Sequence, residues 1–477
     1  MDDTVSCLAL VIEFIKDDKE HTIMDLLRKK AISNVNKEIN LAQCLSAFDL
    51  VLLGVGAIVG AGIFVLTGIA AANEAGPAIV LSYILAGFAC AFSALSYAEL
   101  ASTIGGCGSA YGYAYAGFGE LIAWIVGWDL LLEYAISVPA VAVGWSGYFN
   151  DFLLSLKIHL PNYLLHGPEG GGLFNLSAFS VIIFLSLLLI CGVKSSSRVN
   201  NLMVLIKLLV ICLFIGIAVT EVKPQNWSPF MPYGWQGVAQ GASMIFFAYI
   251  GFDAVSTAAE EARNPQRDLP IGIIGSLIIC TILYIVVAGL LTGIASYTTL
   301  NNPSPISHVL LTLGYKFAAA LVGVGAVAGL TTVMLVLFFG LTRIFLAMAR
   351  DGLLPDYFAV ISEQNKSPVR IIVLCGLLMA LLSAFVPMHD LAELVNIGTL
   401  FAFIIVCLGV IILRYRQPNL HRPFKTPLMP FVPILGVLSC LYLIFHLPGV
   451  TMLRFFFWMF FGVIIYAFYS RFTSKLN

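Results

Sequence analysis

Long apolar runs recur along the chain and are separated by short polar segments. About twelve of them reach the roughly 20 residues that a helix needs to cross the hydrocarbon core of a membrane. The chain is therefore predicted to be an all-α membrane protein with twelve transmembrane helices. The runs predict spans near 47–72, 78–102, 118–149, 175–192, 199–219, 237–260, 270–296, 314–349, 369–387, 391–413, 428–446 and 453–470.

The composition agrees with a lipid environment. The 477 residues are 60% hydrophobic and only 11% charged, which is more apolar surface than a soluble core can bury. A net charge of −1 argues against a nucleic-acid partner. None of the 10 cysteines falls in a predicted outer loop, so neither a disulfide framework nor redox chemistry is expected.

Lysine and arginine are distributed unequally between the connecting segments. With both termini inside, the inner segments carry twenty of these residues and the outer segments carry four. This bias predicts a multi-pass protein of the cell (inner or plasma) membrane with both termini in the cytoplasm. We expect a cytoplasmic N-terminal segment at 1–46, a core at 47–413, and two further helices with the C-terminus at 414–477. No role is predicted for residues 1–23.

Two of the predicted spans are interrupted by glycine near their middle. The interruptions lie at 59–64 in the first span and at 246–261 in the sixth. Because the first and sixth spans are five positions apart in the order of spans, an odd offset, the segments 47–219 and 237–413 run through the membrane in opposite directions. This arrangement is typical of a five-plus-five inverted repeat whose helices 1 and 6 are broken near the bilayer midplane.

Broken helices expose backbone groups that suit a zwitterionic ligand. Unpaired N–H groups near Gly62, at the start of the outer half of the first span, suit a carboxylate. Unpaired carbonyls at 248–250 suit an ammonium, and Asp253 is expected to cap the following half-helix. An α-amino acid carries both charged groups. The alternative is that Gly56 and Gly60 serve helix packing, as a G-x-x-x-G pair often does in membranes.

Lys207 lies eight residues into the fifth span, about 12 Å along the helix, which is too deep for its side chain to reach the interface easily. Charged residues at this depth usually face the protein interior and serve a function. We predict that Lys207 carries a proton or stands in for a bound cation. The alternative is a fixed structural charge that binds the carbonyls of a broken helix.

Several acidic residues also fall within or beside predicted spans. Asp129 and Glu133 are four residues apart and share one face of the third span, with Glu133 expected to face the cavity. Glu120 is expected at the cytoplasmic interface. Glu260 and Glu261 are expected at a polar helix end, and a gating role for them stays open.

Several motifs together resemble the amino acid–polyamine–organocation superfamily, and within it the cationic amino acid transporter family, especially its bacterial members. The resemblance covers roughly 40–470 and implies alternating access, with the inverted repeat followed by two further helices. The motifs are GAIVGAGIFVLTG, GCGSAYGYAYAGFGE, GWDLLLEYAISVPAVAVGWSGYF, FFAYIGFDAVSTAAEEARNPQRDLPIGI and TRIFLAMARDGLLP.

The resemblance also implies roles for individual residues. Lys207 matches the lysine that couples transport to protons, Glu133 matches an acidic residue lining the site, and Leu337 matches a position beneath the substrate side chain. The substrate amino group is expected at Phe247, Ala248 and Ile250. The substrate carboxylate is expected at the backbone of Ile58, Gly60, Ala61, Gly62 and Ile63.

The predicted pocket is apolar and bulky, so we expect proton-coupled uptake of small neutral L-amino acids. Ala61 stands where some relatives carry a hydroxyl residue, which removes one hydrogen bond to the carboxylate. The alternative is a uniporter or exchanger of arginine and lysine, with Glu133 as the partner of the basic side chain. An enzyme is not expected, because no H-E-x-x-H motif occurs, and neither a cofactor nor a metal is expected. A sensor without transport and a small single-span partner subunit remain open.

Overall fold

The computed structural model describes residues 45–104, 110–155, 157–191, 197–258, 262–362 and 367–475. These ranges form helices joined by short connections and contain no strand beyond an isolated bridge between Leu45 and Ala262. The α-helices are α3 (Ala47–Ile58), α4 (Thr67–Ala70), α5 (Ile79–Ile104), α6 (Ala110–Gly117), α7 (Glu120–Ser155), α8 (Leu176–Ile190), α9 (Ser197–Glu221), α10 (Gly234–Ile245), α11 (Ala254–Thr257), α12 (Pro265–Ile294), α13 (Pro305–Thr312), α14 (Lys316–Arg350), α15 (Val369–Phe385), α16 (Met388–Arg416), α17 (Phe431–Phe445), α18 (Gly449–Ile465) and α19 (Arg471–Thr473).

Short π-helical and 3₁₀-helical segments extend or join these helices. The π-helical segments are η1 (Gly62–Leu66), η2 (Ala71–Ala75) and η11 (Tyr466–Ser470). The 3₁₀-helical segments are η3 (Gly76–Ala78), η4 (Asn162–Leu164), η5 (Pro168–Gly170), η6 (Pro224–Trp227), η7 (Phe246–Tyr249), η9 (Tyr297–Thr299) and η10 (Asp356–Phe358).

The helices coincide with the apolar runs, and each of the twelve predicted spans contains at least one of them. Within the described residues, 7 helical segments are long and apolar enough to cross a membrane, and α3, α8, α15 and α17 are shorter apolar helices. The sequence did not predict α6 and α13. The protein is therefore an all-helical multi-pass membrane protein, whereas the number of crossings and the inverted repeat stay predictions.

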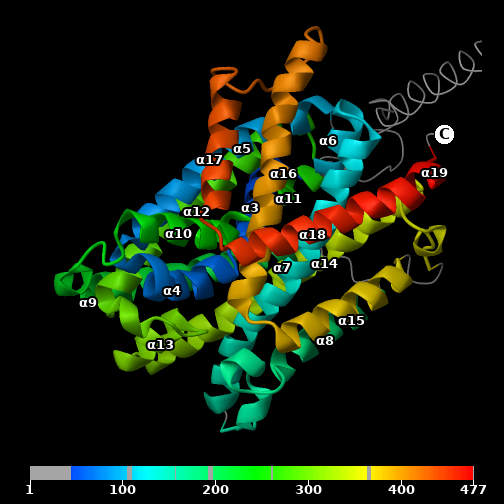
Figure 1. The fold of residues 1–477 in the computed structure, drawn as a ribbon. Helices are drawn as coiled ribbons and strands as arrows, with labels where there is room; N and C mark the ends of the chain where they lie inside the picture. Colours follow the sequence, from blue (N-terminus) through cyan, green and yellow to red (C-terminus); the bar gives the residue numbers. More distant parts are fainter. Residues whose placement is uncertain are drawn as a thin grey trace, which may run out of the picture.

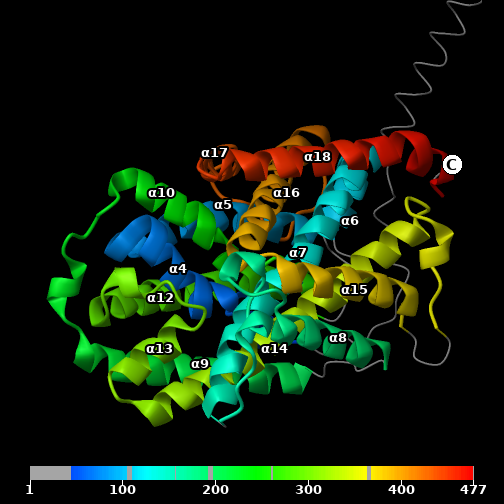
Figure 2. The same cartoon turned by 60° about the horizontal axis from the view of Figure 1, so that its bottom comes forward.

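The long helix α7 runs through the bundle and packs against α14 and α16, while α12 packs against α3 and α5. Figures 1 and 2 show α8 and α15 side by side along one side of the molecule. The outer helices expose large apolar side chains, as lipid contact requires: on α18, Phe456 and Phe457 are about 60% exposed. The interior of the bundle contains the short segments η1 and η7, which adjoin the broken helices.

A capping box fixes the start of α3. The backbone N–H of Asp49 donates to the Ser46 hydroxyl at 3.3 Å, and the Ser46 N–H donates to the Asp49 carboxylate at 3.0 Å. This reciprocal pair satisfies donors that a helix start otherwise leaves unpaired.

Nearly all of the predicted segment 1–46 lies outside the described residues, as do Glu260 and Glu261.

A buried ion-pair network ties the end of α5 to the segment after α16. Glu99 is 1% exposed and accepts hydrogen bonds from Nε and Nη2 of Arg414 at 2.8 and 2.6 Å. Arg422 lies 3.4 Å from the same carboxylate, and the backbone N–H of Thr426 donates to it at 2.7 Å. This clustering of donors around one buried carboxylate fixes the 414–426 segment against α5.

The expectation that Glu120 is an interfacial charge is wrong. Glu120 is 1% exposed, and its carboxylate accepts hydrogen bonds from the hydroxyls of Tyr115, Tyr466 and Ser474. Residues 466–474 pack over the start of α7 and bury this end. The carboxylate therefore anchors the C-terminal segment.

Candidate functional site

A small buried cavity lies where the two broken helices meet. Its wall comes from the end of α3, the break after it, η1, α7, η7 and α14. The cavity has a volume of about 20 Å³, which is room for about one water molecule, so a ligand as large as an amino acid could enter only if the site opened. The lining residues are Ala57, Ile58, Gly60, Ala61, Gly62, Ser137, Val141, Phe247, Ile250, Val333 and Leu337.

The structure brings most of the predicted site residues together around this cavity. Of the predicted substrate-binding residues, Ile63, Ala248 and Glu133 do not line it but are buried, and Lys207, the predicted proton carrier, lies outside the lining as well. The lining contains one hydroxyl, that of Ser137, and no charged side chain. Polar contacts with a ligand in this cavity would therefore come from backbone groups and one hydroxyl.

Both helices are interrupted where glycine predicted a break. After α3 the chain is extended at Val59, with ψ 94°, and η1 begins at Gly62. After η7 it is extended at Ile250, with ψ 135°, and Gly251 has φ +116°, a conformation that requires glycine. Asp253 precedes α11 as predicted, but its side chain forms no cap hydrogen bond.

Gly62 lies where the two broken segments touch. A Cβ atom at this position would lie 2.2 Å from the Cβ of Ala248 and 2.3 Å from its Cα. Those separations are far below ordinary carbon contact, so the close approach of η1 and η7 requires glycine. Gly62 thus has a packing role that the sequence did not indicate, in addition to lining the cavity.

Tyr284 of α12 connects the two breaks, and sequence reasoning missed it. Its hydroxyl lies 2.8 Å from the carbonyl oxygen of Ile58 and 2.7 Å from that of Ala248. A hydroxyl has one proton, so the two carbonyls share one donor. Tyr284 is fully buried and lies on an apolar helix, where a lone tyrosine gives no sequence signal for this role.

Lys207 of α9 supports the end of α3 from another direction. The residue is 1% exposed, and its Nζ donates to the carbonyl oxygens of Gly56 at 2.8 Å and Val59 at 3.2 Å. A helix leaves its last carbonyls unpaired, and a cation is favourable at that end of the dipole. The prediction that Lys207 is buried is confirmed. Its contact with the carbonyls at the end of α3 is the one expected if Lys207 is a fixed structural charge, the alternative to a proton carrier.

Asp129 and Glu133, the two acidic residues predicted near the middle of α7, are buried but do not line the cavity. Glu133 is 3% exposed, and its main-chain carbonyl accepts the Ser137 hydroxyl at 2.6 Å. Asp129 is fully buried, and neither of its carboxylate oxygens has a hydrogen-bond partner among the described residues. It faces α16 at Gly398. A basic substrate in the cavity would therefore find no acidic side chain in the lining.

Apolar helices that break around a small, backbone-lined cavity are typical of a membrane transporter. The family model described as amino acid permease matches residues 45–473, and the chain belongs to this family. It is therefore an amino acid permease, in a family of transporters.

Three relatives illustrate the range of the family. The chain is 49% identical to the branched-chain amino acid permease BcaP of Bacillus subtilis over 95% of this chain and 99% of the relative. It is 47% identical to the methylthioribose transporter of the same organism, again over 95% and 99%. It is 39% identical to the vacuolar cationic amino acid transporter 4 of Arabidopsis thaliana over 83% of this chain and 68% of the relative.

Proposed function

We propose that this permease is a secondary active transporter that takes up small neutral L-amino acids together with protons, by alternating access in the cell membrane. The lining of the cavity carries this proposal: apolar side chains from η7 and α14, with backbone at both breaks. The backbone of Ile58, Gly60, Ala61, Gly62 and Ile63 would hold the carboxylate, and that of Phe247, Ala248 and Ile250 the amino group.

The substrate side chain would lie against apolar surface at Phe247, Ile250 and Leu337. A guanidinium or ammonium group there would lose its hydration without gaining a partner, because Glu133 lies outside the lining. The name of the BcaP relative supports a neutral aliphatic substrate. The methylthioribose transporter, at nearly the same identity, favours a second candidate in which the ligand is a thio-sugar.

Protonation of Lys207 would be coupled to the conformation of the backbone that lines the site. Its Nζ binds the carbonyl of Val59, next to the cavity-lining Gly60, so its charge acts on the backbone that would hold the substrate. Loss of the charge would weaken the interaction between Lys207 and the carbonyl oxygens at the end of α3, because the carbonyl end of a helix favours a cation. Twelve spans, the inverted repeat and cytoplasmic termini complete the proposed architecture.

The test is uptake into proteoliposomes that contain the purified protein. Labelled alanine, leucine, arginine and methylthioribose are compared with and without an inward proton gradient. The proposal expects the neutral amino acids to accumulate and the gradient to increase their uptake. Preferential uptake of arginine or of methylthioribose would overturn the substrate class.

Lys207→Gln tests the coupling separately. The variant keeps hydrogen-bond donors but loses the charge, so we expect the ratio of uptake at acidic to neutral outside pH to fall towards one. Lys316→Gln, at the exposed start of α14, is the control and should keep the wild-type ratio. If Lys207→Gln keeps that ratio as well, Lys207 does not couple transport to protons.

A further inference from the structure

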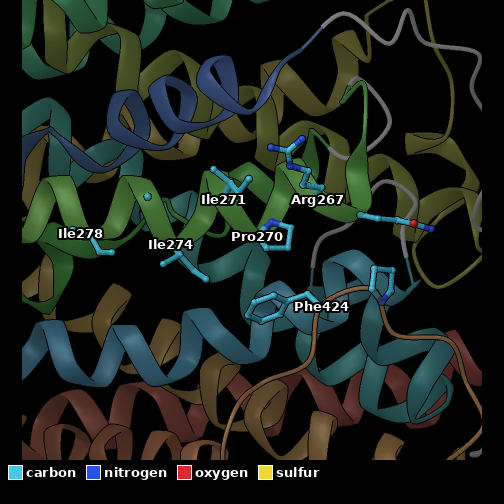
Figure 3. A pocket seen from close by; sticks show the side chains of 9 residues that line it. Arg267, Pro270, Ile271, Ile274, Ile278 and Phe424 are labelled. Carbon is cyan, nitrogen blue, oxygen red and sulfur yellow. The ribbon is translucent and has the colours of Figure 1, made fainter.

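A large open groove lies on the outer side of α12, away from the cavity. It has a volume of about 660 Å³ and is lined by residues of α12 and by Pro423 and Phe424 of the segment after α16. Figure 3 shows Arg267 near one end of the α12 row and Ile278 at the other, with Phe424 across from Pro270. We call this feature the α12 groove.

The wall that α12 contributes is apolar and faces outward. Ile271 and Ile278 are 41% and 54% exposed on a helix that is apolar enough to cross a membrane. In a membrane such a surface contacts lipid chains. Ile278 lies 11 positions after Arg267, which is a rise of about 17 Å along a helix, close to the roughly 15 Å of hydrocarbon in one leaflet. The groove thus has the length of one acyl layer.

The polar end of the groove is basic. Arg267 is exposed and lines the groove, and within the described ranges its guanidinium takes part in no ion pair. Lys425 follows Phe424 and is exposed as well. By contrast, the neighbouring Arg414 and Arg422 are bound to the buried carboxylate of Glu99. Among the described residues, Arg267 is therefore the arginine at the groove that no carboxylate neutralises, and it is exposed to a ligand in the groove.

We propose that the α12 groove is a binding site for an anionic phospholipid. The headgroup phosphate would bind Arg267, and one acyl chain would lie along Ile274 and Ile278, with Phe424 on the opposite side. A guanidinium binds phosphate oxygens through paired hydrogen bonds, and basic pockets at the membrane surface select anionic headgroups. This site is separate from the proposed substrate site and does not depend on which substrate is carried.

Helix α12 connects the groove to the proposed substrate site. Gly272 and Gly275 on α12 pack against Leu50 and Val51 of α3. Tyr284, which binds both breaks, lies six residues beyond Ile278, or about 9 Å further along the helix. A lipid that fixes α12 against the 423–424 segment would thereby also steady the helix on which both breaks depend.

Native mass spectrometry of the delipidated full-length protein tests the proposal. Phosphatidylglycerol and phosphatidylcholine with identical acyl chains are titrated in parallel. Wild type should bind phosphatidylglycerol more tightly. Arg267→Ala should lower that preference about five-fold, because one basic residue near a membrane surface contributes about that much to binding of an anionic lipid. Ile274→Trp, which fills the groove, should weaken binding of both lipids.

Arg416→Ala is the matched control, since Arg416 is an exposed arginine near a helix end outside the groove lining. It should keep the wild-type preference, and all three variants should elute as folded monodisperse protein. Three results would overturn the proposal. The two lipids could bind equally to wild type, Arg416→Ala could lose as much preference as Arg267→Ala, or a protein subunit could occupy the groove and exclude lipid. Measuring amino acid uptake on the same samples keeps this outcome separate from that of the proposed function.

Discussion

Substituting Gly62 with alanine should force the two broken helices apart. Ordinary contact between carbon atoms is about 3.5–4.0 Å. A Cβ at Gly62 would lie 2.2 Å from the Cβ of Ala248, so the segments must separate by roughly 1.3–1.8 Å. Overpacking in a well-packed interior typically costs about 1–3 kcal/mol. Because one of the atoms met is the backbone Cα of Ala248, which no rotamer change can move, we expect about 3 kcal/mol or more.

The assay is the fraction of protein that stays monodisperse after heating in detergent, with a ligand-binding measurement on the surviving protein. Gly62→Ala should lower the melting temperature clearly. Gly216→Ala is the matched control, since a Cβ there meets nothing within 4 Å and the residue lies within α9. That substitution should be neutral or slightly stabilising, because alanine favours a helix over glycine.

The double variant Gly62→Ala, Ala248→Gly distinguishes a clash with backbone from a clash between side chains. Ala248→Gly removes the methyl that lies 2.2 Å away but leaves the Cα at 2.3 Å, so it should not restore Gly62→Ala. Full recovery of stability in the double variant would show that the clash is between side chains alone. If Gly62→Ala is as stable as wild type, the close approach of η1 and η7 is not needed for folding.

Three further outcomes follow from the contacts. Glu99→Gln should cost about 3–5 kcal/mol of stability, seen as a fall in melting temperature, because it leaves two arginines without their buried carboxylate. Tyr284→Phe should cost about 1–3 kcal/mol and weaken substrate binding, because the carbonyls at both breaks lose their shared donor; equal affinity in the two proteins would refute this role. Leu337→Ser should extend binding towards longer or basic side chains in a thermal-shift screen of the amino acids, and an unchanged ligand profile would place Leu337 outside the binding surface.

The positions of the helices could be predicted because hydrophobicity carries the information directly. A run of about 20 apolar residues has few alternatives in a membrane. The breaks were also predictable, because glycine at 59–64 and 246–261 is costly in a helix and needs a reason. Both breaks occur in the structure, at Val59 and Ile250.

What the sequence could not provide was the set of contacts between distant elements. Tyr284 is a lone aromatic residue among the apolar residues of α12, and only the crossing of α12 with α3 and η7 gives its hydroxyl two acceptors. Glu120 looked interfacial because the path of the C-terminal residues over α7 cannot be inferred from local pattern. Glu133 was placed in the lining by its helical face, but a face some 100° wide does not fix which neighbour it meets.

The break after α3 can exist in a membrane only because neighbouring helices supply its hydrogen bonds. An unpaired carbonyl in hydrocarbon costs several kcal/mol, and the last turn of any helix leaves its carbonyls without backbone partners. Lys207 from α9 donates to the carbonyls of Gly56 and Val59, and Tyr284 from α12 donates to that of Ile58. The backbone beside the cavity is thus held by two side chains outside its lining. A change in either donor should reshape the site without touching a ligand, so substitutions there should alter affinity and coupling, whereas substitutions in the apolar lining should alter which side chain is accepted.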